Sequence, residues 1–298
     1  MTEHAAQRLV HPLPSRPIRI AAAQAQAVAG DVNANVATVA AMVHDAARAG
    51  ARLVVFPEKF LSGYEPDLIQ ADPHRCAVQP GDPRLDPIAD ACRETGTVAV
   101  VGAAVHDQGD LYVSALVIGA DGEFVTRYDK QNLFKSERKI YREGAAGCTL
   151  QIDGWRLGLG ICYDSGFPEH ARAAALDGCH AYVVGALFSV GNGYHESRTW
   201  FPARALDNTC YAVLANHIGT TGGWDTCGSS AIWGPDGRLL AEAAVEAPQL
   251  ITAELDSQAL LAVRDSEPML RDLRDTTTYA RAQHRLGGLA GGLQDAGA

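Results

Sequence analysis

Residues 157–169 constrain the fold of this chain more strongly than any other segment. The apolar run 157–161 is typical of a short buried strand, and it stops at Cys162. Turn-forming residues follow at 164–166, and Pro168 suits the first turn of a helix that we expect to extend to residue 176. A thiol at such a junction lies exposed beside free backbone N–H groups, which favour the reactive thiolate. The alternative is a buried structural cysteine, and this segment alone leaves both interpretations open.

Apolar runs alternate with helical patterns and turn signals along the rest of the chain. The runs 18–23 and 52–56 flank a helical pattern with Asn33 as its N-cap and Gly50 at its end, which predicts a β-α-β unit with parallel strands. Residues 64–87 are rich in proline and aspartate and are expected to form a loop. Together the patterns predict one mixed α/β domain with helices covering the sheets. Further strands are expected at 98–105, 111–118, 123–128, 149–152, 156–161, 180–186, 211–216, 229–233, 238–243 and 250–254, and further helices at 86–95, 168–176 and 196–207.

Both ends of the chain lack these patterns. Residues 1–17 have no apolar core of the length found in a signal peptide, and we expect them to form a flexible tail. Residues 281–298 are rich in glycine and small side chains, and they are expected to form a mobile tail. The predicted domain therefore covers residues 18–280.

Charge and composition argue against several classes of function. The net charge of −10 and the scattered basic residues argue against binding to nucleic acid or to an anionic membrane. No apolar segment approaches the roughly 20 residues that span a bilayer. The seven cysteines are odd in number and form no C-x-x-C pair, which is typical of reduced thiols in a cytoplasmic protein. No zinc motif is present and Gly158-Leu-Gly160 is only a fragment of a dinucleotide loop, so neither metal nor organic cofactor is expected.

Three reactive side chains directly follow strand-like runs, namely Glu58, Lys130 and Cys162. Strand-end positions of layered α/β proteins converge on one crevice. A carboxylate there can act as general base toward a thiol, and a lysine ammonium can stabilise the oxyanion of a tetrahedral intermediate. The three residues together indicate acyl transfer, although Glu58 and Lys130, taken singly, are more typical of solvated loops.

Five segments of the chain carry a recognisable pattern, namely Phe56-Pro-Glu58 with Gly63-Tyr64, then 128–134, 160–169, 203–208 and 227–237. Through these segments the chain resembles the nitrilase superfamily of carbon–nitrogen hydrolases, over roughly residues 18 to 280. The resemblance implies a four-layer α-β-β-α sandwich. It also implies a homodimer or higher homo-oligomer, and the helices starting near Pro168 and Glu196 are our candidates for the contact.

By this resemblance, Cys162 is the acylated nucleophile, Glu58 the general base and acid, and Lys130 the oxyanion stabiliser. Many members carry a second glutamate that supports the lysine. We expect it at Glu137, seven positions after Lys130, with Glu143 as the competing candidate.

The residues expected around these reactive groups include one departure from the family pattern and three candidates for substrate binding. Asn132 occupies a position where many members have histidine, which predicts different local polar packing without loss of activity. Tyr64, Tyr163 and Phe188 are expected to bind substrate, with Phe188 narrowing the pocket. The backbone N–H of Tyr163 is the expected second oxyanion donor.

The substrate class is less well defined by sequence. Cys162-Tyr-Asp164 resembles the amidase-like branches, which implies release of ammonia from a small carboxamide through a thioester. The short loop after Lys130 resembles that of nitrilases acting on aliphatic dinitriles, so nitrile hydrolysis is the alternative, and N-carbamoyl amide hydrolysis is another. A binding protein that keeps the fold without catalysis is the non-enzyme alternative. The presence of all four polar residues argues against it.

Overall fold

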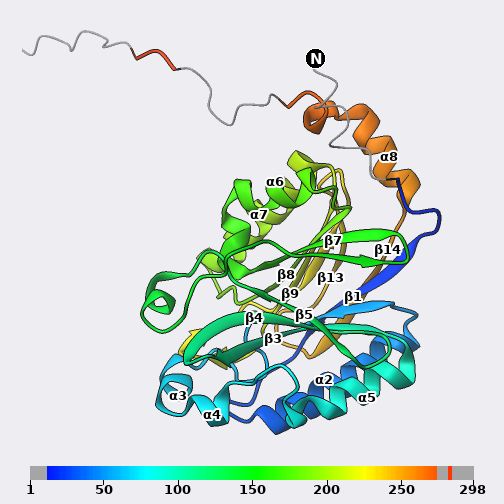
Figure 1. The fold of residues 1–298 in the computed structure, drawn as a ribbon. Coiled ribbons are helices and arrows are strands. Elements are labelled where there is room, and N and C mark those ends of the chain that lie inside the picture. Colours follow the sequence, from blue (N-terminus) through cyan, green and yellow to red (C-terminus); the bar gives the residue numbers. More distant parts are fainter. Residues whose placement is uncertain (1–11, 274–280, 284–298) are drawn as a thin grey trace, which may run out of the picture.

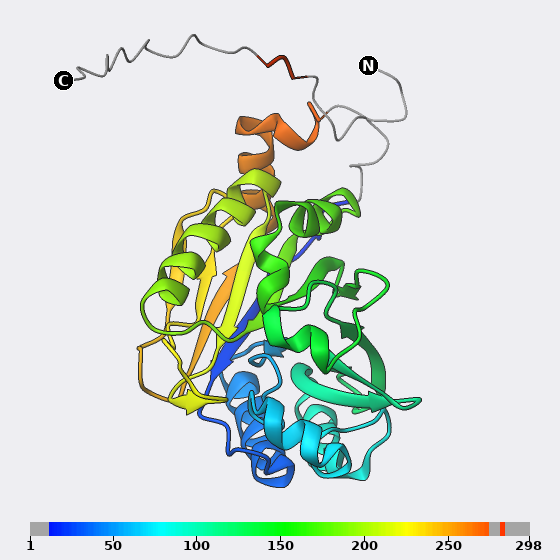
Figure 2. The same cartoon turned by 90° about the vertical axis from the view of Figure 1, so that its left-hand side faces the viewer.

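Two six-stranded sheets lie face to face in the computed structural model, which describes residues 12–273 and 281–283. Helices cover the outer face of each sheet (Figures 1 and 2). Helices α6 (Pro168–Leu176) and α7 (Asn192–Asn208) lie on one side of the molecule, and α2 (Val32–Arg48) and α5 (Asp86–Thr95) lie on the other. The predicted α-β-β-α sandwich is therefore confirmed. Most of the two predicted tails, residues 1–11 and 284–298, lies outside the described residues, and the domain limits 18–280 stay a prediction. Arg16 belongs to the predicted N-terminal tail but lies within the described part, where its backbone carbonyl accepts a hydrogen bond from the indole N–H of Trp155 at 2.9 Å.

The first sheet has the strand order β14-β1-β2-β3-β4-β5. Its central strands β1, β2 and β3 are parallel, as the opening β-α-β pattern predicts, while β4, β5 and β14 pair antiparallel with their neighbours. Helices α2 (Val32–Arg48) and α5 (Asp86–Thr95) bury alanine, valine and isoleucine side chains against this sheet. The strands are β1 (Ile18–Gln24), β2 (Leu53–Val55), β3 (Val98–Asp107), β4 (Asp110–Ile118), β5 (Phe124–Asp129) and β14 (Gln249–Leu255).

The second sheet has the order β13-β12-β9-β8-β7-β6. Its strands β7, β8 and β9 are parallel, and helices α6 (Pro168–Leu176) and α7 (Asn192–Asn208) pack on its outer face. The strands are β6 (Thr149–Ile152), β7 (Trp155–Ile161), β8 (Ala181–Ala186), β9 (Tyr211–Asn216), β12 (Ala231–Trp233) and β13 (Leu239–Glu242). Each sheet thus presents the carboxyl ends of three parallel strands, which is where function is expected in such folds.

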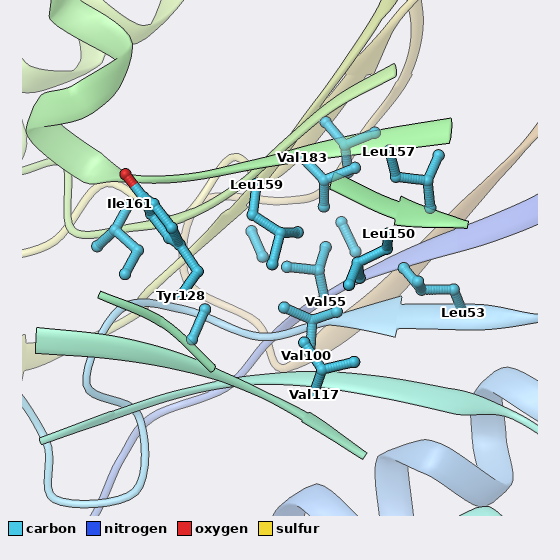
Figure 3. Close-up of a cluster of buried hydrophobic side chains, with 14 of the residues drawn as sticks. Leu53, Val55, Val100, Val117, Tyr128, Leu150, Leu157, Leu159, Ile161 and Val183 are labelled. Carbon is cyan, nitrogen blue, oxygen red and sulfur yellow. The ribbon is translucent and has the colours of Figure 1, made fainter. Parts of the chain in front are cut away.

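The main core lies between the two sheets and explains the composition of β7. Figure 3 shows Leu157 and Leu159 pointing from this strand toward Val55 and Val100 of the facing sheet. The alternate residues face the helices, and a Cβ at Gly160 would lie 2.3 Å from the hydroxyl of Tyr182. Gly158-Leu-Gly160 is therefore a packing pattern, required by close contact on one face of the strand.

Several predicted boundaries differ from the structure. The N-cap of α2 is Asp31, whose carboxylate accepts from the backbone N–H of Ala34 at 3.0 Å, and not Asn33. The predicted loop 64–87 contains the short helices α3 (Pro66–Ala71) and α4 (Pro73–Cys76) and a 3-10 turn, each with proline in its first turn. Helix α7 begins one turn earlier than residue 196, and α8 (Ser257–Ser266) was not predicted.

Candidate active site

Glu58 lies on a loop that both sheets hold by their backbones. A Cβ at Gly102 of β3 would lie 1.9 Å from the carbonyl oxygen of Pro57, and one at Gly185 of β8 would lie 2.3 Å from that of Phe56. The Nε2 of His217 donates to the carbonyl of Glu58 at 2.7 Å, and burial lowers the pKa of this histidine to about 4, so the ring is neutral at pH 7. The backbone of Glu58 is therefore fixed from several sides.

Lys130 follows β5 directly and connects two buried carboxylates. Its Nζ donates to Oε1 of Glu58 and to Oε2 of Glu137, both at 2.7 Å. A 3-10 turn, Lys135–Lys139, brings Glu137 back over the lysine, and the backbone N–H of Phe134 donates to the same carboxylate. An ammonium has three N–H donors, so one is left for a further acceptor.

Cys162 lies at the junction between β7 and a 3-10 helix, Cys162–Gly166, with a φ of 42°. This left-handed backbone is costly for a residue with a side chain and needs support from its surroundings. The support comes from Asp164, whose carboxyl accepts hydrogen bonds from the backbone N–H of Ile161, from the backbone and side chain of Asn132, and from the hydroxyl of Tyr128, at 2.7–3.0 Å. Asn132, in place of the usual histidine, therefore anchors this junction.

One cavity of about 490 Å³ brings the predicted residues together. Glu58, Cys162, Tyr64, Tyr163 and Phe188 all line it, and Lys130 and Glu137 are hydrogen-bonded directly behind them. The binding roles of the three aromatic residues stay predictions. Sequence reasoning missed other parts of the wall. Phe134 comes from the loop before the 3-10 turn, Glu196 and Trp200 from α7, and Trp224 from the hairpin of β10 (Thr220–Thr221) and β11 (Trp224–Asp225).

The charges of the site differ from the expectation in one respect. Burial, together with the neighbouring Glu58 carboxylate, raises the pKa of the Cys162 thiol, and its Sγ donates to the carbonyl of Leu187 at 3.4 Å. The prediction that the strand-end position favours a resting thiolate is therefore wrong, because desolvation outweighs the turn's N–H groups. Burial also raises the pKa of Glu58, whose Oε2 has no hydrogen-bond partner within the described part of the chain.

The two other charged groups remain ionised. Burial alone would lower the pKa of Lys130, but the carboxylates of Glu58 and Glu137 outweigh it and raise that pKa. Burial likewise opposes ionisation of Glu137, yet the ammonium groups of Lys130 and Lys59 lower its pKa to about 2. The site at neutral pH thus holds a thiol beside a carboxylate that is easily protonated.

The other residues considered from sequence, namely Glu143, the further cysteines and Asp164, do not join the reactive groups at the cavity. Glu143 is exposed, so Glu137 is the glutamate that contacts Lys130, as preferred from sequence. All seven cysteines are free, and Cys227 is buried beside the Asn216 amide. Asp164 faces the protein interior, so it does not act directly on the substrate.

Lys59 is the residue of this site that sequence reasoning missed. Its side chain is fully buried, and its Nζ lies 3.6 Å from Oε1 of Glu137 and 3.3 Å from the ring centroid of Tyr64. A signal was present, because the chain has only four lysines among 25 basic residues, and one directly follows Glu58.

Two absences were found among the described residues. No cluster of histidine, cysteine, aspartate and glutamate there could hold a metal ion. No helix in residues 12–273 is both long and apolar enough to span a membrane.

Comparisons with known proteins agree with this geometry. A family model described as carbon-nitrogen hydrolase matches residues 19–265. A Pseudomonas protegens protein described as "Hydrolase in pqqF 5'region" is 34% identical over 75% of this chain and 78% of its own length. A Pyrococcus abyssi protein named nitrilase is 32% identical over 82% of this chain and 89% of its own.

Solved structures of an amidase from Nesterenkonia sp. AN1 have the same fold. A mutant with the acetamide moiety of fluoroacetamide covalently added at the active-site cysteine superimposes with a TM-score of 0.74 and is 28% identical. The match covers 88% of this chain and 100% of that one. Another mutant of the same amidase, also 28% identical, is in complex with butyramide.

Proposed function

The chain belongs to the carbon–nitrogen hydrolase family, and within this family of enzymes we propose that it is a cysteine amidase releasing ammonia from a small carboxamide. The observation that supports this most directly is the meeting of Cys162 and Glu58 at one cavity, with Lys130 and Glu137 hydrogen-bonded behind them. These groups supply a nucleophile, a proton carrier and an oxyanion donor.

Acylation begins with transfer of the Cys162 thiol proton to Glu58, whose Oε2 is available as an acceptor. The raised pKa of Glu58 suits it to hold this proton afterwards. The sulfur attacks the amide carbon, and the carbonyl electron pair moves to oxygen. The unused N–H of Lys130 and the backbone N–H of Tyr163, in the first turn of the 3-10 helix, stabilise that oxyanion. When the intermediate collapses, the C–N bond breaks, the nitrogen takes the proton from Glu58, and ammonia leaves a thioester.

Deacylation uses the same groups in the reverse order. Glu58, again ionised, removes a proton from water, and the resulting hydroxide adds to the thioester carbon. The same two donors stabilise the second oxyanion. The C–S bond then breaks, the sulfur recovers its proton from Glu58, and a carboxylic acid is released.

The cavity walls support a short apolar acyl group as the substrate's other half. The aromatic side chains of Phe134, Tyr163, Phe188 and Trp200 line the space around the nucleophile. Mutants of the Nesterenkonia amidase hold the acetamide moiety of fluoroacetamide on the active-site cysteine in one structure and butyramide in another. We therefore favour short aliphatic carboxamides as substrates.

Nitrile hydrolysis is the second candidate, since the Pyrococcus protein of 32% identity is named a nitrilase. The same nucleophile adds to a nitrile carbon, and the proton from Glu58 goes to the nitrile nitrogen. The resulting thioimidate needs an additional water before ammonia leaves. The two reactions share every residue named above and are separated only by substrate.

Two further proposals concern the state of the protein. Leu176 of α6 and Tyr194 and Leu206 of α7 are exposed, which supports pairing of two chains across this helical layer into a homodimer. A monomer at micromolar concentration in sizing with light scattering would refute it. The seven free cysteines support a reducing compartment such as the cytoplasm.

The test of the proposed reaction is an ammonia-release screen over acetamide, butyramide, omega-amides, N-carbamoyl compounds and aliphatic nitriles. We expect amides to be consumed fastest and mass spectrometry to detect the acyl group on Cys162. Cys162→Ala should abolish turnover, whereas Cys148→Ala, at another partly exposed cysteine, should not. Selective consumption of nitriles would transfer the assignment to a nitrilase. A folded protein without any turnover, whose Cys162 reacts with iodoacetamide no faster than the other thiols, would indicate a binding protein.

A further inference from the structure

Lys59 is a second buried cation in the site, and the mechanism above does not use it. Its side chain is 0% exposed, like that of Lys130, and it lies outside the cavity wall. The ring of Tyr64 lies 3.3 Å and that of Tyr141 4.8 Å from its Nζ, measured to the centroids. Within the described residues its Nζ has no hydrogen-bond partner, and the nearest opposite charge is Oε1 of Glu137 at 3.6 Å.

The position is costly, which argues against a role in stability alone. A buried ammonium loses its hydration, and a methionine of similar length would fill the space between two aromatic rings without that penalty. Lys59 also has a φ of 49°, which a non-glycine residue seldom adopts. The chain otherwise prefers arginine, and two of its four lysines are buried here.

The charges of the cluster indicate what the lysine does. Glu58 and Glu137 carry two negative charges when ionised, while Lys130 carries one positive charge shared between them. Lys59 supplies the second positive charge. Without it, Lys130 would be drawn more strongly onto Glu137, and its remaining N–H would be less available to an oxyanion.

We propose that Lys59 is a positioning residue of this hydrolase, whose ammonium neutralises Glu137 and so leaves Lys130 free to stabilise the oxyanion. The kinetic consequence rests on the proposed function. The groups that face Lys59 are the carboxylates of Glu137 and Glu58, the ammonium of Lys130, the thiol of Cys162, and the rings of Tyr64 and Tyr141.

The pH dependence of turnover follows from the sign of each interaction. Burial lowers the pKa of Lys59 below its ordinary value of 10.5, although Glu137 and Glu58 oppose this. As pH rises, Lys59 therefore loses its proton before an exposed lysine would, and kcat falls. The charge of Lys59 also lowers the pKa of Glu58, which must be ionised to accept the thiol proton.

Kinetics of Lys59→Met, Lys59→Arg and the exposed control Lys139→Met test the proposal. Lys59→Met should lower kcat about 10-fold or more with KM nearly unchanged, and it should move the acid limb of kcat/KM to higher pH. Lys59→Arg keeps the charge, so it should restore the acid limb and move the alkaline limb to higher pH. Lys139→Met should match the wild type. A wild-type kcat and pH profile in Lys59→Met would overturn the proposal.

A measurement on the unaltered protein keeps the test independent of folding and of the substrate. With [ε-¹³C]lysine the intact chain gives four side-chain resonances, and Lys135→Met and Lys139→Met identify the two from the exposed lysines. We expect one of the other two to titrate below 10.5 and to shift in Glu137→Gln. Lys59→Arg identifies the resonance of Lys59, and an unchanged pKa of that resonance in Glu137→Gln would overturn the proposal, whether or not the protein hydrolyses amides.

Discussion

Replacing Asp164 by asparagine tests whether the buried polar contacts behind Cys162 hold the nucleophile in place. Oδ1 of Asp164 accepts from the backbone and side chain of Asn132, and Oδ2 accepts from the backbone N–H of Ile161 and the hydroxyl of Tyr128. An asparagine keeps one oxygen, and its NH₂ group must replace the other.

The structure indicates which orientation of the new side-chain amide leaves fewer hydrogen bonds unmade. The hydroxyl of Tyr128 also lies 2.8 Å from Nε2 of His170, so it can donate there and accept from the new NH₂ group. The side-chain oxygen of the substituted residue therefore stays toward Asn132, and its NH₂ group points toward Tyr128 and Ile161. Of these two partners, only the backbone N–H of Ile161 loses its acceptor, because it then faces another donor. An unpaired buried N–H costs about 1–3 kcal/mol, and weaker hydrogen bonds to the remaining oxygen add about 1 kcal/mol. We expect Asp164→Asn to lose about 3 kcal/mol of unfolding free energy.

Urea unfolding followed by tryptophan fluorescence measures this loss, and steady-state kinetics on the best amide measure its consequence. Because the φ of 42° at Cys162 depends on these contacts, kcat should fall about 10-fold or more. Asp31→Asn is the matched control, since asparagine caps a helix as well as aspartate does. Asp164→Asn within about 0.5 kcal/mol of the wild type and with unchanged kcat would refute the reasoning.

Three other substitutions test separate parts of the structure. Lys130→Met should lower kcat about 10²–10³-fold, and a change in KM alone would contradict its role as oxyanion donor. Glu137 has a pKa of about 2, against an ordinary value of 4.5. Its ionised form therefore stabilises the fold by up to about 3 kcal/mol above pH 4.5, and this stabilisation is lost as the pH falls toward 2. In urea unfolding between pH 5 and 3, the stability difference between wild type and Glu137→Gln should therefore narrow, and a constant difference would count against it. Gly160→Ala should cost about 1–3 kcal/mol because its Cβ would lie 2.3 Å from the hydroxyl of Tyr182. The control Gly147→Ala would bring its Cβ only into ordinary contact with Oε1 of Gln131, at 3.9 Å, and should be neutral in the same unfolding assay.

The reactive residues could be located from sequence because each is marked by a local transition. Glu58, Lys130 and Cys162 follow buried strands directly, and a strand that ends in a polar turn is readable without knowledge of distant contacts. The same holds for α6, where Pro168 fixes the first turn, and its limits agree with the prediction. Asp31 was missed as an N-cap because Asn33, two positions later, is an equally good capping residue by type.

The properties that depend on burial could not be read in this way. The pKa of Cys162 is set by side chains from several distant segments, and its sign is opposite to that suggested by the turn alone. Trp200 and Trp224 reach the cavity from α7 and from the hairpin after β9, and neither is adjacent in sequence to a reactive residue. Lys59 resembles a surface residue until both carboxylates and both tyrosines are placed around it.

The loop that carries Glu58 is held by backbone contacts with glycines of both sheets, whereas Phe188, Trp200 and Trp224 of the cavity wall come from other segments. A protein engineer can therefore treat reaction and selectivity as separable. Randomising Phe188, Trp200 or Trp224 should change which acyl groups are accepted while the proton carrier keeps its place. Substituting Gly102 or Gly185, neither of which lines the cavity, should instead displace Glu58 and so lower turnover of every substrate at once. New specificities are thus to be sought in the walls, with these two glycines left untouched.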